Sequence, residues 1–462
     1  MRTKKRRLEP YLFYDYRGIE AHLERMAERG WRLRRVTPLW WEYRRAEPEK
    51  RTFAVTYFSG ASEFNPAPTE NQRTFHDYCL DAGWELETEW AQIQVFSTAR
   101  EDPVPVETDE AAKLNAINRA MWKNFLPANL VLLALGVFQI VFQVKGVLQN
   151  PVGELSSLAN LFLGAAWLML ALCGIFTVGG YLCWYVRSRR SVAASGACIP
   201  GGAGLLGLSR TVLLLAWVSV LLATASICTM GLGWFGAVVL MRAVVLIALV
   251  FIIKSVLKKV GASGRINRTV TAAASVVLSV LLAGGMLWGV MGEVRSGWLG
   301  RSPAAVETVT MPNGSAYTWE IYRDPLPLTV EDLYPVGDTS YSRRWTLEES
   351  PLVSVGEARQ YDPPGGGAPE LSYTVVDVKL PVLFDLFLEG CIRDNFRGYD
   401  SNEELRRTDD PAWAADRVYQ LFRQNKPIGD YIVCWGTRII SLRTDDALTA
   451  AQIALVTERL RG

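Results

Sequence analysis

The side chains that could do chemistry in this chain are few. Histidine occurs twice, at His22 and His76, in matching places before two Gly-Trp pairs. Paired metal ligation is one interpretation, and helix positions that are exposed or at a boundary are the favoured one. Neither a His-based metal hydrolase nor a Ser-His-Asp triad can form in the rest of the chain, because both need histidine. The sequence contains no phosphate-binding loop, dinucleotide fingerprint, nucleophile elbow or CxxC pair. We therefore expect no catalytic residue, no metal site, no cofactor and no enzymatic activity.

Aromatic residues are concentrated in the N-terminal segment and offer a different kind of site. Four of them could line a groove that takes an apolar or cationic ligand: Trp40, Trp41, Tyr43 and Trp90. A groove of this kind would use the apolar ring faces and their attraction for cations. A compact hydrophobic core explains the same residues more simply, because each aromatic side chain buries a large area.

Charge is distributed unevenly over the 462 residues. Residues 124–291 contain a single acidic residue, Glu154, whereas the segments on either side are rich in charge. This distribution excludes a single soluble globule, a disordered chain, a collagen and a disulfide-rich secreted peptide. It indicates a membrane protein with a folded domain at each end.

A helix needs about 20 apolar residues to cross the hydrocarbon core of a bilayer. The apolar region 211–253 is too long for one crossing, and we expect it to turn at Gly231-Leu232-Gly233. The sequence therefore predicts a five-helix transmembrane bundle, with spans at about 125–145, 157–186, 211–230, 234–253 and 269–291. The predicted domains are a basic N-terminal tail (1–10), a cytoplasmic α+β domain (11–100), a linker (101–123), the transmembrane region (124–292) and an extracytoplasmic α+β domain (293–462).

Lys and Arg gather in the loops after the second and fourth spans, at 187–210 and 254–268. Short basic loops stay in the cytoplasm, so we expect a plasma-membrane protein with its N-terminus inside and its C-terminus outside. The N-terminal cations could contact anionic lipid head groups, although a solvated tail explains them equally well; they are Arg2, Lys4, Lys5, Arg6 and Arg7. A partner protein or small molecule is expected but not identified, and no nucleic-acid partner is expected.

Two features of the spans suggest roles. Arg242 lies inside the fourth span, where a charge is by default a functional hypothesis; the favoured alternative is that it snorkels or pairs with Glu154 or helix carbonyls. Gly285 and Gly289 form a GxxxG pair suited to helix packing. If the topology holds, Cys391 and Cys434 face the outside and could form one disulfide.

The N-terminal domain looks duplicated. AERGWRL at 27–33 is echoed by LDAGWEL at 80–86, and in each the glycine ends a helix before a strand begins. Aromatic strands at 11–16 and 53–58 precede the helices, and hairpins follow them. The predicted unit is strand-helix-strand-strand, used twice, in two small sheets that bury their faces together or join into one sheet.

Two stretches carry a resemblance to a known family: FYDYRGIEAHLERMAERGWRLRRVTPLWWEYRRAEP and DYCLDAGWELETEWAQIQVFSTARED. With Tyr14-Asp15-Tyr16 and the two Gly-Trp pairs, they resemble the domain of unknown function 2812 family of bacterial membrane proteins, over about residues 8–101. The resemblance implies a mostly Gram-positive family often encoded beside PadR-like transcriptional regulators. The family has no assigned chemistry, so the resemblance transfers no catalytic residue.

The C-terminal segment mixes strand and helix periods. Alternation predicts strands at 316–322, 371–378, 431–435 and 438–442, the last two forming a hairpin around Gly436-Thr437. A helix is expected at 380–397, and a final helix begins at the Thr449 and Gln452 capping box.

These features favour a non-enzymatic sensor or accessory protein, in which an outer domain is coupled or anchored to a cytoplasmic domain that binds a ligand or partner. A component of a transport system is the alternative, although five spans do not divide evenly into an inverted repeat. A membrane enzyme ranks third, because it would depend on carboxylates alone.

Overall fold

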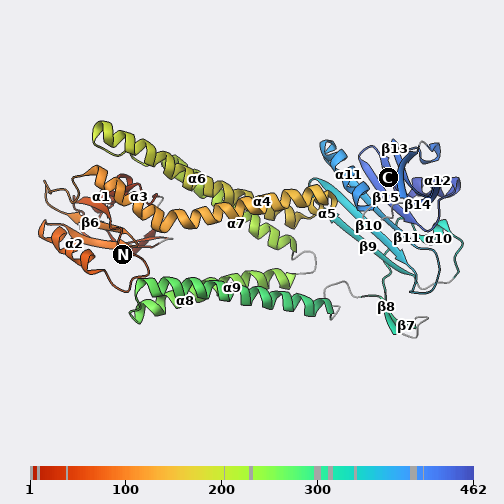
Figure 1. The fold of residues 1–462 in the computed structure, drawn as a ribbon, viewed down its shortest axis with the longest axis horizontal. Helices are drawn as coiled ribbons and strands as arrows, with labels where there is room; N and C mark the ends of the chain where they lie inside the picture. Colours follow the sequence, from red (N-terminus) through yellow and green to blue (C-terminus); the bar gives the residue numbers. More distant parts are fainter. Residues whose placement is uncertain are drawn as a thin grey trace. The chain divides into compact units, whose positions relative to one another are not determined.

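The computed structural model describes residues 4–7, 11–37, 40–201, 203–227, 233–295, 303–310, 316–337, 341–395, 403–408 and 410–462. The chain divides into two compact units (Figure 1). The first unit contains Met1–Gln139, Ala165–Leu221 and Gly233–Gly292, and the second contains Ile140–Gly164, Leu222–Leu232 and Glu293–Gly462.

The N-terminal domain repeats one unit of strand, helix, strand and strand, as predicted. The first copy is β1 (Lys4–Arg7), α1 (Tyr16–Glu28), β2 (Trp31–Val36) and β3 (Trp41–Arg45), and the second is β4 (Thr52–Tyr57), α2 (Glu70–Asp81), β5 (Glu85–Trp90) and β6 (Ile93–Thr98). The two sheets have the matching strand orders β1-β3-β2 and β4-β6-β5. The helices end at Gly30 (φ +75°) and Gly83 (φ +89°), which adopt the left-handed conformation that glycine favours.

Two predicted boundaries at the start of this domain are wrong. The expected strand at 11–16 does not form, because Asp15 is the N-cap of α1. The first strand is instead Lys4–Arg7, which pairs with β3 and therefore belongs to the domain and not to a loose tail. Within it, Arg6 forms an ion pair with Glu42 at 2.8 Å; Arg2 lies outside the described residues.

The predicted linker at 101–123 is largely helical. It contains α3 (Glu110–Ala120) and the start of a π-helical turn, Met121–Phe125, which runs directly into α4 (Leu126–Gln149). Proline has no backbone N–H, so Pro127 disturbs the normal helical hydrogen bonding at this place. Apolar residues of this helix are buried in the core of the N-terminal domain: Leu114, Ile117, Ala120, Met121 and Leu126. The domain therefore extends into the first membrane helix.

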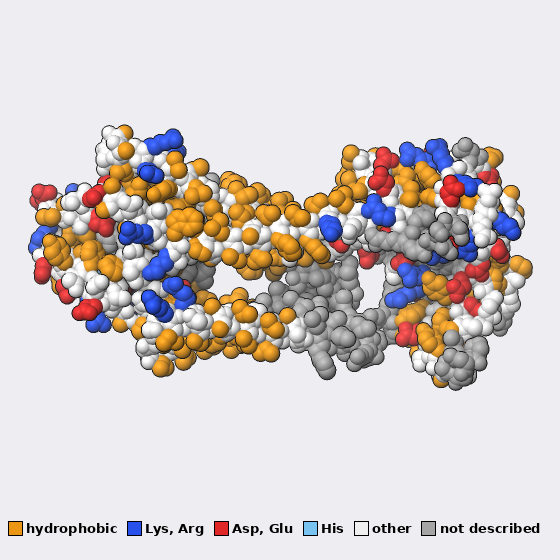
Figure 2. All heavy atoms as spheres, viewed as in Figure 1, with side chains coloured by type: hydrophobic (Ala, Val, Ile, Leu, Met, Phe, Trp, Pro, Cys, Tyr) orange, Lys and Arg blue, Asp and Glu red, His pale blue; other side chains and the backbone are white. Residues whose placement is uncertain are grey.

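Among the described residues, four helices are long and apolar enough to cross a membrane: Leu126–Gln149, Leu158–Ser195, Gly207–Ser226 and Gly264–Gly285. They lie in α4, α6 (Leu158–Ser195), α7 (Ala203–Ile227) and α9 (Gly264–Arg295). Hydrophobic side chains cover most of the visible surface of the long helices (Figure 2). The expected span at 234–253 lies in α8 (Gly233–Lys259). That helix is not one of the four, and its side chains 233–240 are outside the described residues, so five spans remain a prediction.

Small residues bring α4 and α6 together at places that the sequence analysis missed. A Cβ at Gly136 would lie 3.1 Å from Ala171 Cβ, and one at Gly174 would lie 3.0 Å from Leu133 Cβ. The predicted packing pair behaves differently: a Cβ at Gly285 would have no atom within 4 Å among the described residues. The surroundings of Gly289 are outside the described residues, so a role of this pair in helix packing remains a prediction.

The C-terminal domain is built on an antiparallel sheet of seven strands in the order β12-β13-β14-β15-β11-β10-β9. The strands are β9 (Ser342–Glu349), β10 (Val353–Tyr361), β11 (Leu371–Val378), β12 (Glu403–Thr408), β13 (Arg417–Arg423), β14 (Lys426–Trp435) and β15 (Arg438–Thr444). A hairpin of β7 (Ala305–Thr310) and β8 (Ala316–Ile321) precedes the sheet, and the helices are α10 (Val330–Leu333), α11 (Phe384–Asn395) and α12 (Ala450–Leu460). The predicted strands, hairpin and capped final helix are present.

Helices cover both faces of this sheet. On one face, Val376 and Ile439 pack in a buried cluster with Phe387 of α11; on the other, Tyr373 and Val433 pack in a cluster with α12 and α10. The short helix α5 (Pro151–Ser156), between α4 and α6, adds Val152 and Leu155 to the α11 side. A segment between two membrane helices thus packs against the core of the C-terminal domain.

Candidate functional site

Tyr14, Asp15 and Tyr16 join the N-terminal domain to the end of a membrane helix. Asp15, 8% exposed, accepts a hydrogen bond from Gly18 N at 3.2 Å, which caps α1. It also accepts one from Gly201 N at 2.9 Å, in the segment after α6. One carboxylate therefore both begins a helix of the domain and holds the chain that leaves the membrane helix.

Tyr16 strengthens the same contact through Glu110 of α3. Its hydroxyl donates to Glu110 Oε2 at 2.6 Å, and Cys198 N donates to the same oxygen at 3.2 Å. Burial alone would raise the pKa of Glu110, but these two hydrogen bonds outweigh it and lower that pKa. Burial, with the hydrogen bond to Glu110, raises the pKa of Tyr16. The carboxylate therefore stays charged while its partner stays a neutral donor.

Tyr14 supplies the apolar part of the contact. Its ring lies 4.7 Å from the ring of Trp184 and 5.4 Å from that of Tyr181, both on α6. Trp184 Nε1 donates to the carbonyl of Ile199 at 3.0 Å, and Tyr181 donates to Asn118 Oδ1 at 2.7 Å. Burial raises the pKa of Tyr14 to about 12. We call the contacts of Tyr14, Asp15, Tyr16 and Glu110 with Tyr181, Trp184, Cys198 and Gly201 the α6 junction.

A second contact joins the loop 58–65 to the turn between α8 and α9. Glu63 forms an ion pair with Lys254 Nζ at 3.0 Å, and that ammonium lies 4.8 Å from the centre of the Phe64 ring. Asn267, fully buried, donates to the carbonyl of Phe64 at 3.0 Å. A Cβ at Gly264 would overlap the side-chain oxygen of Asn65, so a larger residue there would have to displace that side chain. We call this contact the α8–α9 junction.

The comparison with protein families bears on the domain that makes both junctions. Residues 15–129 match the family model for a protein of unknown function (DUF2812). This segment belongs to the DUF2812 family. The match begins at Asp15 and ends inside α4, so it extends beyond residue 101, where the sequence analysis had placed its end. Neither the curated proteins nor the solved structures compared with the chain gave a match.

The aromatic residues predicted to bind a ligand do not share one groove in the DUF2812 domain. Tyr43 is fully buried, and its hydroxyl lies 3.1 Å from His22 Nε2. Trp41 packs on Tyr11 with ring centres 5.8 Å apart, whereas Trp40 is 37% exposed beside Arg6. Tyr43 therefore belongs to the core and Trp41 packs against it, whereas Trp40 is exposed.

The fourth predicted residue, Trp90, does line a cavity. This cavity has a volume of about 470 Å³ and is formed by the loop 61–68, Arg35, Glu89 and the end of α8 with Lys254 and Lys258. It adjoins the α8–α9 junction, because Glu63 and Lys254 contribute to both. Of the predicted aromatic site, one residue therefore lies where a ligand has room.

Several polar groups buried in the DUF2812 domain lack hydrogen-bond partners among the described residues. Between α2 and its sheet, they include both amide atoms of Gln94, Thr56 Oγ1 and His76 Nε2. Near α3, Glu107 Oε2 makes no hydrogen bond and lies 3.8 Å from Lys113 Nζ. Burial raises the pKa of Glu107, although Lys113 opposes the change. Such groups cost folding free energy, which makes them useful places for a test.

The remaining predicted residues have plain environments. Arg242 is partly exposed on α8, and no described residue forms an ion pair with it; Glu154 accepts a hydrogen bond from Asn160 at 3.1 Å. Cys391 and Cys434 lie in one buried cluster as free thiols, and burial raises the pKa of each to about 12. No group of three or more metal-ligating side chains occurs in the part of the chain that the structure describes.

Proposed function

We propose that the chain is a multi-pass plasma-membrane sensor or accessory protein without catalytic activity, in which a C-terminal domain outside the cell acts on a cytoplasmic DUF2812 domain. One observation carries the proposal. Helix α4 begins at Leu126, which is 1% exposed in the DUF2812 core, and the helix that follows it, α5, packs against the core of the C-terminal domain. Helix α4 thus links the two cores along the chain, with a single residue, Asn150, between α4 and α5.

The way the chain divides supports five crossings and opposite sides for the two domains. The turn between α4 and α6 belongs to the same compact unit as the C-terminal domain. The segment after α6 and the basic end of α8 instead contact the DUF2812 domain, through Gly201 and Lys254. The same basic segments are the ones that the positive-inside rule assigns to the cytoplasm. Two independent criteria therefore favour the same topology.

The two junctions suggest how a signal would reach the DUF2812 domain. The α6 junction holds the end of one membrane helix, and the α8–α9 junction holds the turn of a helix pair. A shift of α6 relative to α8 and α9 would have to break one set of contacts or move the domain. Packed interfaces of this kind usually have discrete arrangements and do not deform smoothly. A ligand in the C-terminal domain would act by favouring one arrangement.

The test disturbs α5 and reads out the DUF2812 domain. We expect Val152→Asn, which places an amide against the buried cluster around α11, to change hydrogen exchange in the segment 197–201 of the full chain in nanodiscs. The matched control is Val382→Asn, at a position that is 87% exposed in the same domain. Unchanged exchange at 197–201 with an unfolded or loosened C-terminal domain would contradict coupling. A chain in which both domains respond only by unfolding together would contradict it as well.

A further inference from the structure

We propose that the cavity at the α8–α9 junction binds the head group of one anionic phospholipid from the cytoplasmic leaflet. The cavity of about 470 Å³ is lined by three cationic side chains, those of Arg35, Lys254 and Lys258. A second depression of about 300 Å³ lies on α8 and is lined by Phe251, Ile252, Ser255, Val256 and Lys259. Phe251 and Ser255 line both, so a compartment with charged side chains and an apolar one are neighbours.

The charges in the polar compartment favour an anion. Two carboxylates share the cavity with the three cations: Glu63, which pairs with Lys254 at 3.0 Å, and Glu89, which accepts a hydrogen bond from the Gln72 amide at 2.6 Å and keeps its charge. The lining therefore carries one more positive charge than negative. Arg35 and Lys258 form no ion pair with any residue that the structure describes. Guanidinium and ammonium groups that are free in this way bind phosphate through charge-assisted hydrogen bonds.

The apolar compartment indicates that the anion carries a hydrocarbon chain. Large apolar side chains are exposed along α8, including Val244 (66%), Ile247 (55%), Phe251 (59%) and Ile252 (55%). A helix surface of this kind faces lipid tails, and the lysines that follow it mark the head-group level. Lys and Arg side chains are visible at this end of the helix pair (Figure 2). A water-soluble phosphate would leave the apolar compartment exposed, so a phospholipid fits the cavity better.

Such a lipid would bridge two parts of the chain. Arg35 and Trp90 belong to the DUF2812 domain, and Lys258 belongs to α8. A bound lipid stabilises the arrangement in which both sides contact it, so the α8–α9 junction would depend on the anionic lipid content of the membrane. Of the N-terminal cations that the sequence analysis linked to lipid, Lys4, Lys5, Arg6 and Arg7 form β1, and their contact with lipid remains a prediction. This inference does not rest on the proposed coupling.

The test measures lipid retention by the full chain. Native mass spectrometry of the protein released from nanodiscs of mixed phosphatidylglycerol and phosphatidylcholine would count bound lipids, and titration would give their relative affinities. We expect one phosphatidylglycerol to be retained in preference to phosphatidylcholine. Lys258→Gln and Arg35→Gln should each weaken this preference by about fivefold, the effect of one cation near an anionic surface.

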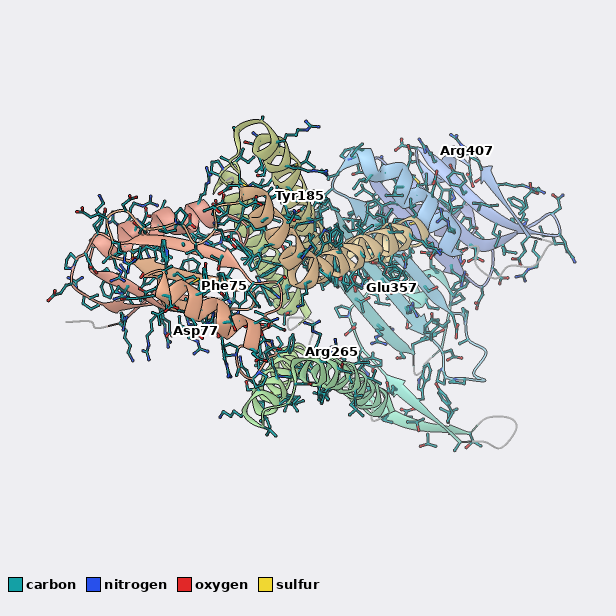
Figure 3. The ribbon with its side chains drawn as sticks, turned by 60° about the vertical axis from the view of Figure 1, so that its left-hand side comes forward. Phe75, Asp77, Tyr185, Arg265, Glu357 and Arg407 are labelled. Carbon is teal, nitrogen blue, oxygen red and sulfur yellow. The ribbon has the colours of Figure 1, made fainter. Side chains whose placement is uncertain are left out.

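Arg265→Gln is the matched control, because Arg265 is an exposed cation in α9, next to the same turn, and lines neither compartment (Figure 3). Its phosphatidylglycerol retention should equal that of the native chain. An equal loss in all three variants would mean diffuse surface attraction and would overturn the proposal. Retention without preference for phosphatidylglycerol would overturn it as well. So would full competition by millimolar inorganic phosphate, which would identify a site for the free anion.

Discussion

Replacing Asp15 by serine separates the two hydrogen bonds that its carboxylate accepts. Serine is a good N-cap, so the bond from Gly18 N is retained, but its side chain is too short to reach Gly201 N. A hydrogen bond to a charged group contributes about 1.5–3 kcal/mol. The hydrogen bond from Gly201 N is 2.9 Å long. Its loss should therefore raise the equilibrium constant for local opening of the segment after α6 by about ten- to a hundredfold.

The assay is hydrogen exchange of the full chain in nanodiscs, followed on peptides that cover 197–201 and α1. We expect faster exchange at 197–201 and unchanged exchange in α1 for Asp15→Ser. Asp15→Ala should accelerate hydrogen exchange in both segments, because alanine is a poor N-cap. Replacing an aspartate N-cap by alanine costs about 0.5–2 kcal/mol of helix stability. Asp15→Asn, which keeps an oxygen acceptor, should have the smallest effect. Native exchange at 197–201 in Asp15→Ser would refute the α6 junction as described.

Three further substitutions test the energetics of the DUF2812 domain. Glu107→Gln should raise the unfolding temperature at pH 7.5, because the folded-state pKa of Glu107 is raised and its ionised form destabilises the folded chain. The contribution of Glu107 to the free energy of unfolding is complete below the usual carboxyl pKa of about 4.3. It is lost as the pH rises through the raised folded-state pKa. The gain should vanish at pH 4, and a pH-independent gain would contradict this cause. Gln94→Leu should add about 1–3 kcal/mol to the unfolding free energy, because neither amide atom of Gln94 has a hydrogen-bond partner among the described residues; a lower unfolding free energy in a denaturant titration would contradict this. Gly201→Ala should destabilise by about 1–3 kcal/mol, since its Cβ would lie 2.6 Å from Asp15 Cβ; Gly207→Ala, which has open space, is its control in the same thermal scan.

Local signals in the sequence were enough for elements with strong caps or regular alternation. The strand Leu371–Val378 and the capping box of Thr449 and Gln452 appear as predicted. The duplicated Gly-Trp pairs correctly marked the helix ends at Gly30 and Gly83. In each case neighbouring residues determine the structure, so a short window contains the information.

Elements decided by distant contacts were missed. The aromatic run from Tyr11 to Tyr16 suggested a strand, but Tyr14 and Asp15 contact the segment after α6, far along the chain. Strand β12 carries mainly charged residues because it lies at the edge of its sheet, where charge prevents unwanted pairing. No apolar alternation therefore marked it.

In the candidate site, too, residues with a local sequence signal were predicted and residues that depend on distant contacts were missed. Trp90 was named from composition, but the cations that share its cavity come from β2 and α8. The role of Tyr14-Asp15-Tyr16 as a docking motif depends on partners in α3, α6 and the following segment. One signal was available and overlooked: Leu114, Ile117 and Met121 have helical spacing, and all three are buried, so 101–123 could have been assigned to the domain.

The central claim is that the DUF2812 domain and the α8–α9 turn lie on one side of the membrane and the C-terminal domain lies on the other. Single cysteines at exposed positions test it: Asp77→Cys on α2, Arg265→Cys in α9 next to the turn and Arg407→Cys on β12 (Figure 3), each in a chain whose native cysteines are replaced. A membrane-impermeant maleimide applied to intact cells should label Arg407→Cys at once and the other two only after permeabilisation. Labelling of all three in intact cells, or of Asp77→Cys alone, would contradict the account.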